Sequence, residues 1–245
     1  MKIIRFSQFF KKKATSENKN NPQNEQERLK KRIKNLEDLN MSVDAELIDI
    51  IADSQGFYKE LRDSGFPDET EFPHTTAYIN AVKPIPKDFI DIVMKWIPKR
   101  KYKGWPVGFL REAKNKYDGR VLIPIFNESN KLGRWSICDA IDYNPPLHIN
   151  DWVKETYLSK EYGHSETGLL PLAVAKMFPK DEARAILKQG FDHHYRVTPE
   201  ALGKTGTAED IPFLEEKLLM DYDATHVHKD IEKAIKRIKK RAKLI

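Results

Sequence analysis

Residues 201–219 read ALGKTGTAEDIPFLEEKLL, and the triplet Gly203-Lys204-Thr205 inside this stretch looks like the end of a phosphate-binding loop. Such a loop also needs a glycine five residues before Gly203, where this chain has Thr198. The loop must follow a strand, whereas TPEAL, with Pro199 in its first turn, predicts the start of a helix. The spacing therefore argues against a nucleotide-binding loop and favours helices on this stretch.

The rest of the chain also shows helical rather than strand periodicity. From about residue 86, amphipathic runs alternate with short polar or Pro/Gly breaks, and no stretch alternates with the strand period of two between hairpin turns. The apolar run VLIPIF at 121–126 contains a proline and has helical neighbours, so we do not expect a strand there. Further helices are predicted at 25–39, 43–52 and 54–64, the last ending at Gly65. The predicted fold class is all-α.

Five segments share an alanine followed by a charged or polar end and then a new amphipathic helix. The spacings of 27, 35, 26 and 33 residues between these alanines fit helical hairpins of two helices and two turns. We expect the small side chain to let adjacent helices approach closely. The five alanines are Ala113, Ala140, Ala175, Ala201 and Ala234.

The same pattern resembles the HEAT repeats of the short bacterial type, also called PBS-lyase HEAT-like repeats. Those repeats end one helix in Ala-Leu-Gly, here residues 201–203, and begin the next with a pattern similar to Ile-Pro-Phe-Leu, here residues 211–214. Residues 119–141 and 161–177 resemble two further units, and the resemblance covers roughly 85–243. It implies an α-solenoid of antiparallel helix pairs, but it implies little about chemistry because one fold serves many functions.

Charge divides the chain into an arm, a body and a basic end. Residues 1–40 carry 11 Lys/Arg and 5 Asp/Glu, and residues 231–245 carry 7 and 1, so each segment has a net charge of +6 while 41–230 has −6. We predict a basic polar arm over 1–40, partly disordered or forming one short helix. Residues 41–245 are predicted to form the HEAT-like solenoid, closed by a C-terminal capping helix with a polar outer face.

No pattern of catalytic or metal-binding residues is recognisable. The histidines of FDHHYR (191–196) and ATHVHKD (224–230) match no zinc spacing and are interpreted as loop or surface residues. Carboxylate pairs such as Glu209/Asp210 are interpreted as charges at helix N-termini or on solvated faces. The one cysteine, Cys138, is expected to be a buried thiol within a helix at 134–141. We therefore predict a chain that is not an enzyme, with no catalytic, cofactor or metal site.

Residues 94–120, MKWIPKRKYKGWPVGFLREAKNKYDGR, form the most distinctive candidate binding segment. It has 9 basic and 2 acidic residues interleaved with aromatic residues, a composition that suits phosphates and stacked bases, or an acidic protein, as well as an ordinary polar turn. The second helices of the predicted pairs, at about 104–116, 132–142, 168–177, 198–204 and 225–242, would line a concave face. The candidate partner-binding residues are Trp105, Arg111, Arg134, Trp135, Lys204, Lys99, Arg100 and Lys101.

These observations leave three functional hypotheses open. The first is a non-enzymatic protein-binding scaffold or adaptor whose partner is another protein. An immunity or regulatory protein is one such case. The alternative is a nucleic-acid-binding protein or a HEAT-like DNA repair enzyme that uses 94–120, although the acidic body argues against a long phosphate track. A lyase acting on bilin pigments is suggested only by the alternative name of the repeat.

The sequence also predicts where the protein works. The N-terminus has only short apolar runs followed at once by charges, unlike a secretory signal, and no stretch approaches the ~18 apolar residues of a membrane span. A single cysteine excludes an intramolecular disulfide. We therefore expect a cytoplasmic protein without a membrane span.

Overall fold

The computed structural model describes residues 22–101 and 104–244, without the side chains of residues 22, 23 and 105. Within these residues the regular structure is helical, and β-pairing is limited to two isolated bridges, Ile85 with Ala113 and Asp118 with Leu147. The predicted all-α class is confirmed. The predicted arm over 1–40 lies outside the described residues as far as residue 21.

The chain forms two compact units, which are described separately. The N-terminal unit consists of residues up to 102 together with 112–114, and the C-terminal unit consists of 103–111 together with 115–245. The elements of the N-terminal unit are α1 Pro22–Glu37, α2 Ala45–Asp53, α3 Gln55–Asp63, η2 Glu69–Glu71, α4 Thr75–Val82, α5 Lys87–Trp96 and η3 Ile97–Lys99. The C-terminal unit contains α6 Gly104–Val107, η4 Gly108–Glu112 (whose last residue belongs to the N-terminal unit), η5 Gly119–Val121, α7 Leu122–Glu128, α8 Lys131–Tyr143, α9 Asn150–Leu158, α10 His164–Thr167, α11 Leu170–Met177, α12 Lys180–Gln189, α13 Thr198–Thr205, η6 Ala208–Asp210, α14 Ile211–Lys217 and α15 Val227–Arg241.

An aromatic cluster forms the core of the N-terminal unit. The ring of Phe89 on α5 packs edge-on against Phe57 of α3 and against Phe66, and Tyr78 of α4 packs against Tyr58. Gly65 has a φ of +88°, and the amides of residues 65 and 66 donate to the carbonyls of Arg62 and Leu61. This is the glycine-terminated helix end that the sequence predicted, and it aims Phe66 into the cluster.

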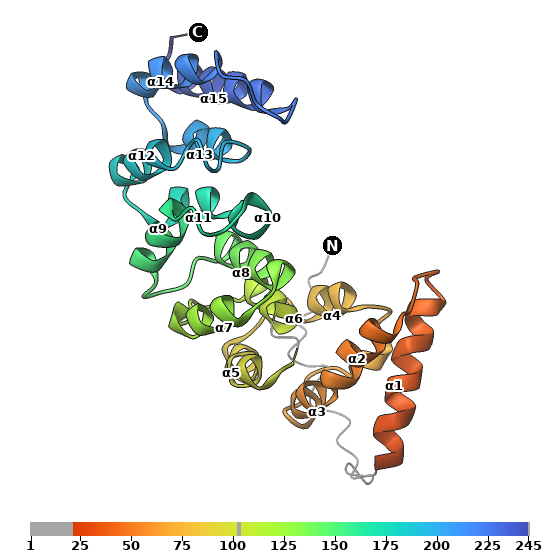
Figure 1. Cartoon of the computed structure of the whole chain (residues 1–245). Coiled ribbons are helices and arrows are strands. Elements are labelled where there is room, and N and C mark those ends of the chain that lie inside the picture. The colour runs from red at the N-terminus through yellow and green to blue at the C-terminus, as the bar shows by residue number, and fades with distance from the viewer. Residues whose placement is uncertain (1–21, 102–103, 245) are drawn as a thin grey trace, which may run out of the picture. The chain divides into compact units, whose positions relative to one another are not determined.

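The helices of the C-terminal unit follow one another in two layers (Figure 1). Helices α8, α11, α13 and α15 pack in chain order, each against the next, and α6 packs against α8. Helices α7, α9, α12 and α14 lie on the other side, and each contacts a helix of the first row. Fully buried apolar side chains such as Phe126, Tyr157, Leu187 and Leu202 fill the space between the layers. Each helix pair therefore shares its apolar face with the neighbouring pair.

The small residues at 201, 203 and 234 let α13 and α15 approach closely. A Cβ added to Gly203 would lie 3.1 Å from the Cα of Ala234 and 3.3 Å from its Cβ. Gly203, Lys204 and Thr205 form the last residues of α13, and Lys204 pairs with Glu200 one turn earlier at 2.8 Å. Gly203 therefore allows the close contact between α13 and α15, and the triplet Gly203-Lys204-Thr205 lies in a helix rather than in a phosphate-binding loop.

The predicted roles of the anchor alanines are only partly correct. Ala140, Ala201 and Ala234 are buried within α8, α13 and α15. In α11 the fully buried alanine is Ala173, whereas Ala175 is half-buried. Ala113 lies outside any helix and forms a bridge with Ile85.

The predicted helix over 104–116 is wrong. The segment forms only the single turn α6 and the 3-10 helix η4, which is followed by the isolated bridge at Ala113. Gly104, Pro106 and Gly108 explain this, because two glycines and a proline within five residues disfavour a continuous helix. The bridge at Ala113 then takes the backbone hydrogen bonds that a helix would have used, since Lys114 donates to Ile85 at 2.8 Å.

Candidate partner-binding surface

Helix α8 exposes a line of large apolar side chains. Leu132 is 71% exposed, Trp135 40% and Tyr143 56%. Their spacing of three and eight residues places them on one face of the helix, together with Asp139, while Ile137, Cys138 and Ile141 are fully buried on the other face. The helix begins at the side chain of Asn130, which accepts a hydrogen bond from the amide of Gly133 at 2.9 Å. We call Leu132, Trp135 and Tyr143 the α8 face.

Arg111 closes one end of the α8 face. Its guanidinium group lies 2.9 Å from Asp139 and 3.8 Å above the ring centre of Tyr143. Burial raises the pKa of Asp139, and the Arg111 charge offsets part of this shift. The buried Nε of Arg111 has no hydrogen-bond partner among the described residues. Arg111 therefore orients Tyr143 and keeps one donor unused, which places this predicted residue at the candidate surface.

Two lysines lie at the same end of α8. Lys176 of α11 donates to the carbonyl and the carboxylate of Asp142, both at 2.6 Å, and Lys116 donates to the carbonyl of Pro145 at 2.6 Å. Partial burial lowers the pKa of Lys116, and the positive charge of Lys176 lowers it further. Both lysines thus contact residues that adjoin Tyr143 in the sequence, Asp142 for Lys176 and the 144–145 segment for Lys116.

The other predicted residues of the C-terminal unit have different environments. Arg134 makes its contacts within the unit. Its Nε donates to the carbonyl of Phe126 at 3.1 Å, and its Nη1 pairs with Glu166 at 2.7 Å. Its guanidinium group also lies 4.9 Å from the ring centre of Tyr162. Trp135 is on the open α8 face, and Lys204 is exposed on α13. The side chain of Trp105 lies outside the described residues.

Lys99, Arg100 and Lys101 belong to the N-terminal unit, so the basic-aromatic segment 94–120 is divided between the two units. Arg100 is only 2% exposed and pairs with Asp53 at 2.6 Å. Lys101 pairs with Asp49, and Lys99 lies 5.6 Å from the ring centre of Trp96. Carboxylates of α2 thus pair with two of the nine basic residues of this segment.

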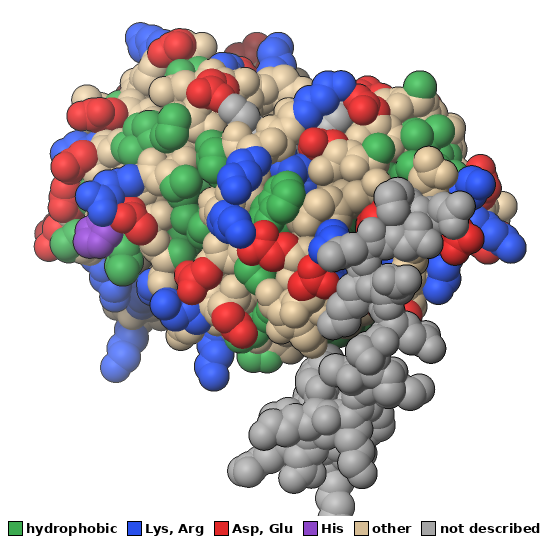
Figure 2. Space-filling view, turned by 90° about the horizontal axis from the view of Figure 1, so that it is seen from below, with side chains coloured by type: hydrophobic (Ala, Val, Ile, Leu, Met, Phe, Trp, Pro, Cys, Tyr) green, Lys and Arg blue, Asp and Glu red, His purple; other side chains and the backbone are tan. Residues whose placement is uncertain are grey.

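The surface charges seen in Figure 2 agree with this pairing. On the face drawn there, Lys and Arg side chains are interspersed with Asp and Glu and with hydrophobic groups. Lys95 likewise pairs with Glu60 at 2.7 Å. The carboxylate of Glu60 also accepts a hydrogen bond from the Trp96 indole at 2.6 Å. The hydrogen bond from Lys95, opposed by partial burial, lowers the pKa of Glu60.

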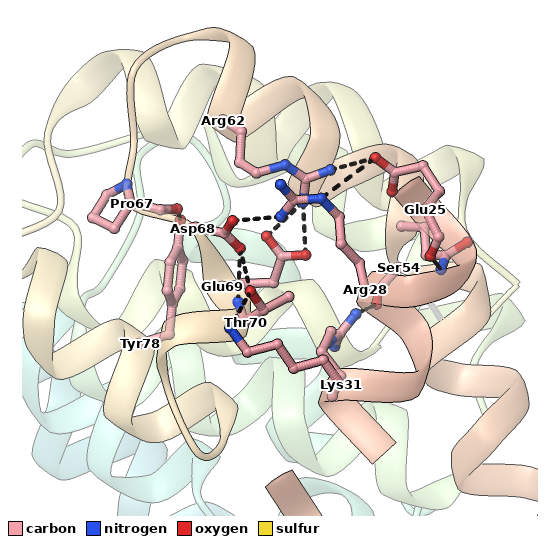
Figure 3. A network of polar contacts seen from close by, with 12 residues as sticks. Glu25, Arg28, Lys31, Ser54, Arg62, Pro67, Asp68, Glu69, Thr70 and Tyr78 are labelled. Carbon is pink, nitrogen blue, oxygen red and sulfur yellow. Dashed lines mark hydrogen bonds and ion pairs between the residues drawn. The ribbon is translucent and has the colours of Figure 1, made fainter. Parts of the chain in front are cut away.

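A second polar arrangement, which sequence analysis missed, attaches α1 to the N-terminal unit (Figure 3). Arg62 of α3 pairs with Glu25 of α1 at 2.7 Å and with Glu69 of η2 at 2.6 Å, and Arg28 of α1 pairs with Asp68 at 2.5 Å. Burial lowers the pKa of Arg62, but its hydrogen bond to Glu69 and the surrounding carboxylates leave it above the usual value. The partners are 7 to 40 residues apart, so no local spacing could have revealed them.

Arg32 completes this attachment at the middle of α1. Its guanidinium donates to the hydroxyl of Ser54 at 2.6 Å and lies 4.6 Å over the ring of Tyr58. Burial lowers its pKa, and Tyr58 offsets only part of that effect. An open groove of about 370 Å³ lies next to α1 and η2 and is lined by Lys31, Asn35, Asp38, Leu39, Thr70, Glu71 and Pro73. Asn35 crosses the groove to the carbonyls of residues 70 and 72 at 3.2 Å, so the groove belongs to the contact between α1 and η2.

The histidines are more structural than expected. His194 lies in the loop between α12 and α13, as predicted, but it is fully buried rather than at the surface. Its ring stacks on Tyr157 with the ring centres 4.7 Å apart and bonds to the carbonyl of that residue at 2.9 Å. Burial, with a smaller contribution from His193, lowers the pKa of His194 to about 4. No three His, Cys, Asp or Glu side chains in the described residues are arranged to hold a metal ion. Cys138 is buried in α8 as predicted.

Comparison of the chain with protein-family models, with curated proteins and with solved structures gave no match. The resemblance to short HEAT repeats thus stays a prediction from the sequence pattern. In the described part of the chain, no helix has the combined length and apolar character needed to cross a membrane.

Proposed function

We propose that the chain is a non-enzymatic protein-binding scaffold whose C-terminal unit is a HEAT-like stack of helix pairs. The order of helix contacts supports this proposal, because α8, α11, α13 and α15 each pack on the next as the second helices of such repeats do. The first helices α7, α9, α12 and α14 lie behind them. An α-solenoid of this kind presents one row of helices for binding.

The α8 face is the observation that carries the proposal. Leu132, Trp135 and Tyr143 expose apolar and aromatic surface in one line on that row of helices. Single exposed apolar residues are ordinary, but an aligned set that contains a tryptophan and a tyrosine has the composition of an interface hot spot. The Arg111 guanidinium fixes the ring of Tyr143, so little side-chain entropy is left to lose on binding.

The charges around the α8 face indicate the chemistry of the partner. Lys176 pairs with Asp142 and Lys116 donates to the carbonyl of Pro145, so both lysines lie near the Tyr143 end of α8, where the charge of Lys176 lowers the pKa of Lys116. A partner that places an acidic group there would relieve the repulsion between the two ammonium groups. The partner we propose is therefore a protein that presents an apolar anchor next to acidic side chains.

Affinity capture with the full chain from its native cell tests this proposal. We expect a stoichiometric protein partner that is retained by the wild type and lost with the double variant Leu132→Ser/Trp135→Ser. The matched control is Leu219→Ser/Met220→Ser, which removes two exposed apolar side chains elsewhere on the unit and should retain the partner. Recovery of no stoichiometric protein, or equal recovery with both double variants, contradicts the proposal.

No observation favours nucleic-acid binding or DNA repair by the segment 94–120. Lys95, Arg100, Lys101 and Arg111 all pair with carboxylates of this chain. A phosphate would have to displace those carboxylates before it could gain the same contacts.

A further inference from the structure

Helix α15 carries a stripe of lysines on its outward face. Lys229, Lys233, Lys236 and Lys240 are all exposed and follow the spacing i, i+4, i+7, i+11, which aligns them along one side of a helix. The opposite side is buried and consists of Val227, Ile231, Ala234, Ile235 and Ile238. We call these four residues the lysine stripe. Among the described residues only Lys233 has a carboxylate partner, Asp230 at 2.8 Å.

A polar cap does not require this arrangement. Lysines three and four residues apart on one helix face repel each other, and the stripe contains three such neighbouring pairs. Lys229 lies in the first turn, where the helix dipole favours acidic rather than basic side chains. A mixture of Glu and Lys would keep the face equally soluble and would stabilise the helix. An anionic ligand on the stripe would compensate this repulsion.

The helices packed against α15 do not neutralise the stripe. On the α13 side, Arg237 lies beside Gly203, and Arg241 donates to the carbonyls of residues 203 and 206. On the α14 side, Lys239 pairs with Glu215 at 3.5 Å. Glu232 and Asp230 are the acidic residues of α15 itself, whose sequence has seven basic and two acidic residues, a net charge of +5.

The chemistry of the face selects one class of ligand. Every exposed residue of α15 is charged, and the exposed residue that precedes the helix is His226. The face therefore has no apolar anchor for a protein interface. The apolar side of the helix is buried in the unit, which leaves nothing to insert into a membrane. Lysines act as point charges and suit phosphate contacts that carry no sequence information.

We propose that the lysine stripe binds the phosphate backbone of a nucleic acid without reading its sequence. At ~1.5 Å rise per residue the stripe extends about 16 Å, the axial length of about five phosphates of one strand in duplex DNA. The site is short, which fits a body whose net charge opposes a longer track. This surface is separate from the α8 face and from segment 94–120, and the inference does not depend on the proposed scaffold function.

Fluorescence anisotropy of the full chain with a labelled 20-base-pair DNA of mixed sequence, titrated between 25 and 200 mM salt, tests the inference. Four phosphate contacts predict a slope of about −3.6 for log K against log salt, and each single Lys→Gln variant in the stripe should reduce that slope by about 0.9. The quadruple variant K229Q/K233Q/K236Q/K240Q should bind more than tenfold more weakly at 50 mM salt. Circular dichroism and thermal unfolding of this variant check that it is folded, so that a loss of binding can be assigned to the missing charges.

The matched control is K83Q/K114Q/K160Q/K180Q. It removes the same charge from four exposed lysines that have no ion pair among the described residues, and it should bind DNA as the wild type does. Three results overturn the inference: no binding at 25 mM salt, equal losses in the two quadruple variants, or full binding by the stripe variant. Stripe-dependent binding to polyglutamate, or to vesicles containing phosphatidylserine, that is tighter than binding to DNA also overturns it in favour of an acidic protein or a membrane.

Discussion

Helices α1 and α15 are both rich in lysine and arginine, but they are attached to their units by different forces. Five side chains of α15 are buried, all of them apolar. In α1 the described side chains are half-buried or exposed, and the apolar Leu29, Ile33 and Leu36 are only half-covered. Ion pairs of Arg28 and Arg62 hold it instead (Figure 3), together with hydrogen bonds from Arg32 and Asn35. The chain thus uses apolar burial for one basic helix and ion pairs for the other.

This difference has consequences for stability and motion. Apolar burial responds weakly to salt, whereas half-exposed ion pairs weaken as ions screen them. Elements with few buried apolar contacts also open locally at lower free energy than elements in a core. We therefore expect α15 to open only with its unit and α1 to open by itself.

Truncation of a buried isoleucine should produce the largest effect. Ile238→Ala empties a fully buried position where α15 meets α13, and the lost transfer energy plus the cavity should lower the free energy of unfolding by about 3 kcal/mol. Ile33→Ala on α1 makes the same chemical change at a half-buried position and should cost less than about 1 kcal/mol. Urea unfolding of both variants measures the contrast, and equal losses would contradict it.

Removal of the central arginine of the α1 network should follow. Arg62→Met leaves the nearly buried carboxylate of Glu69 without this partner and also breaks the contact with Glu25, so we expect a loss of about 2 to 3 kcal/mol for the N-terminal unit. Lys59→Met breaks an exposed pair with Asp63 on the same helix and should cost under about 0.5 kcal/mol. Thermal unfolding of both variants measures the difference. Equal losses of stability would show that the network of Arg62 does not stabilise the unit.

Acid should destabilise the C-terminal unit through His194. Its pKa of about 4 in the folded unit is below the ordinary value of 6.5, so the unfolded chain binds the extra proton first. The contribution of neutral His194 is complete above pH 6.5 and is lost as the pH falls to 4, which amounts to about 2 kcal/mol at pH 5. In urea unfolding at pH 7 and pH 5, His194→Gln should lose that much less stability than the wild type, and an equal loss in both would contradict this account.

The sequence predicted helices better than it predicted which side chains meet. The end of α3 at Gly65 and the helical state of 121–126 followed from local steric rules, and both are correct. The continuous helix over 104–116 failed because periodicity was given more weight than two glycines and a proline.

Burial was harder to predict than helix position. In α11 the fully buried alanine is Ala173 rather than Ala175. Residues two positions apart on a helix point to different sides, so the composition of the segment does not show which alanine is buried. Of the α8 face, Trp135 was predicted, whereas Leu132 and Tyr143 were not, since exposure of an apolar residue depends on which neighbouring helix is present. The α1 network joins residues far apart in sequence, so only the folded structure could show it.

Hydrogen exchange of the full chain in 0.05 M and 1 M NaCl compares the two modes of attachment in one experiment. Screening of the pairs made by Arg28 and Arg62 should weaken α1 by about 1 kcal/mol, which corresponds to about fivefold faster exchange over residues 22–37. The amides of α13 and α15 should exchange at unchanged rates, because buried apolar side chains hold these helices together. Unchanged exchange in α1, or equal acceleration in α15, would contradict the account.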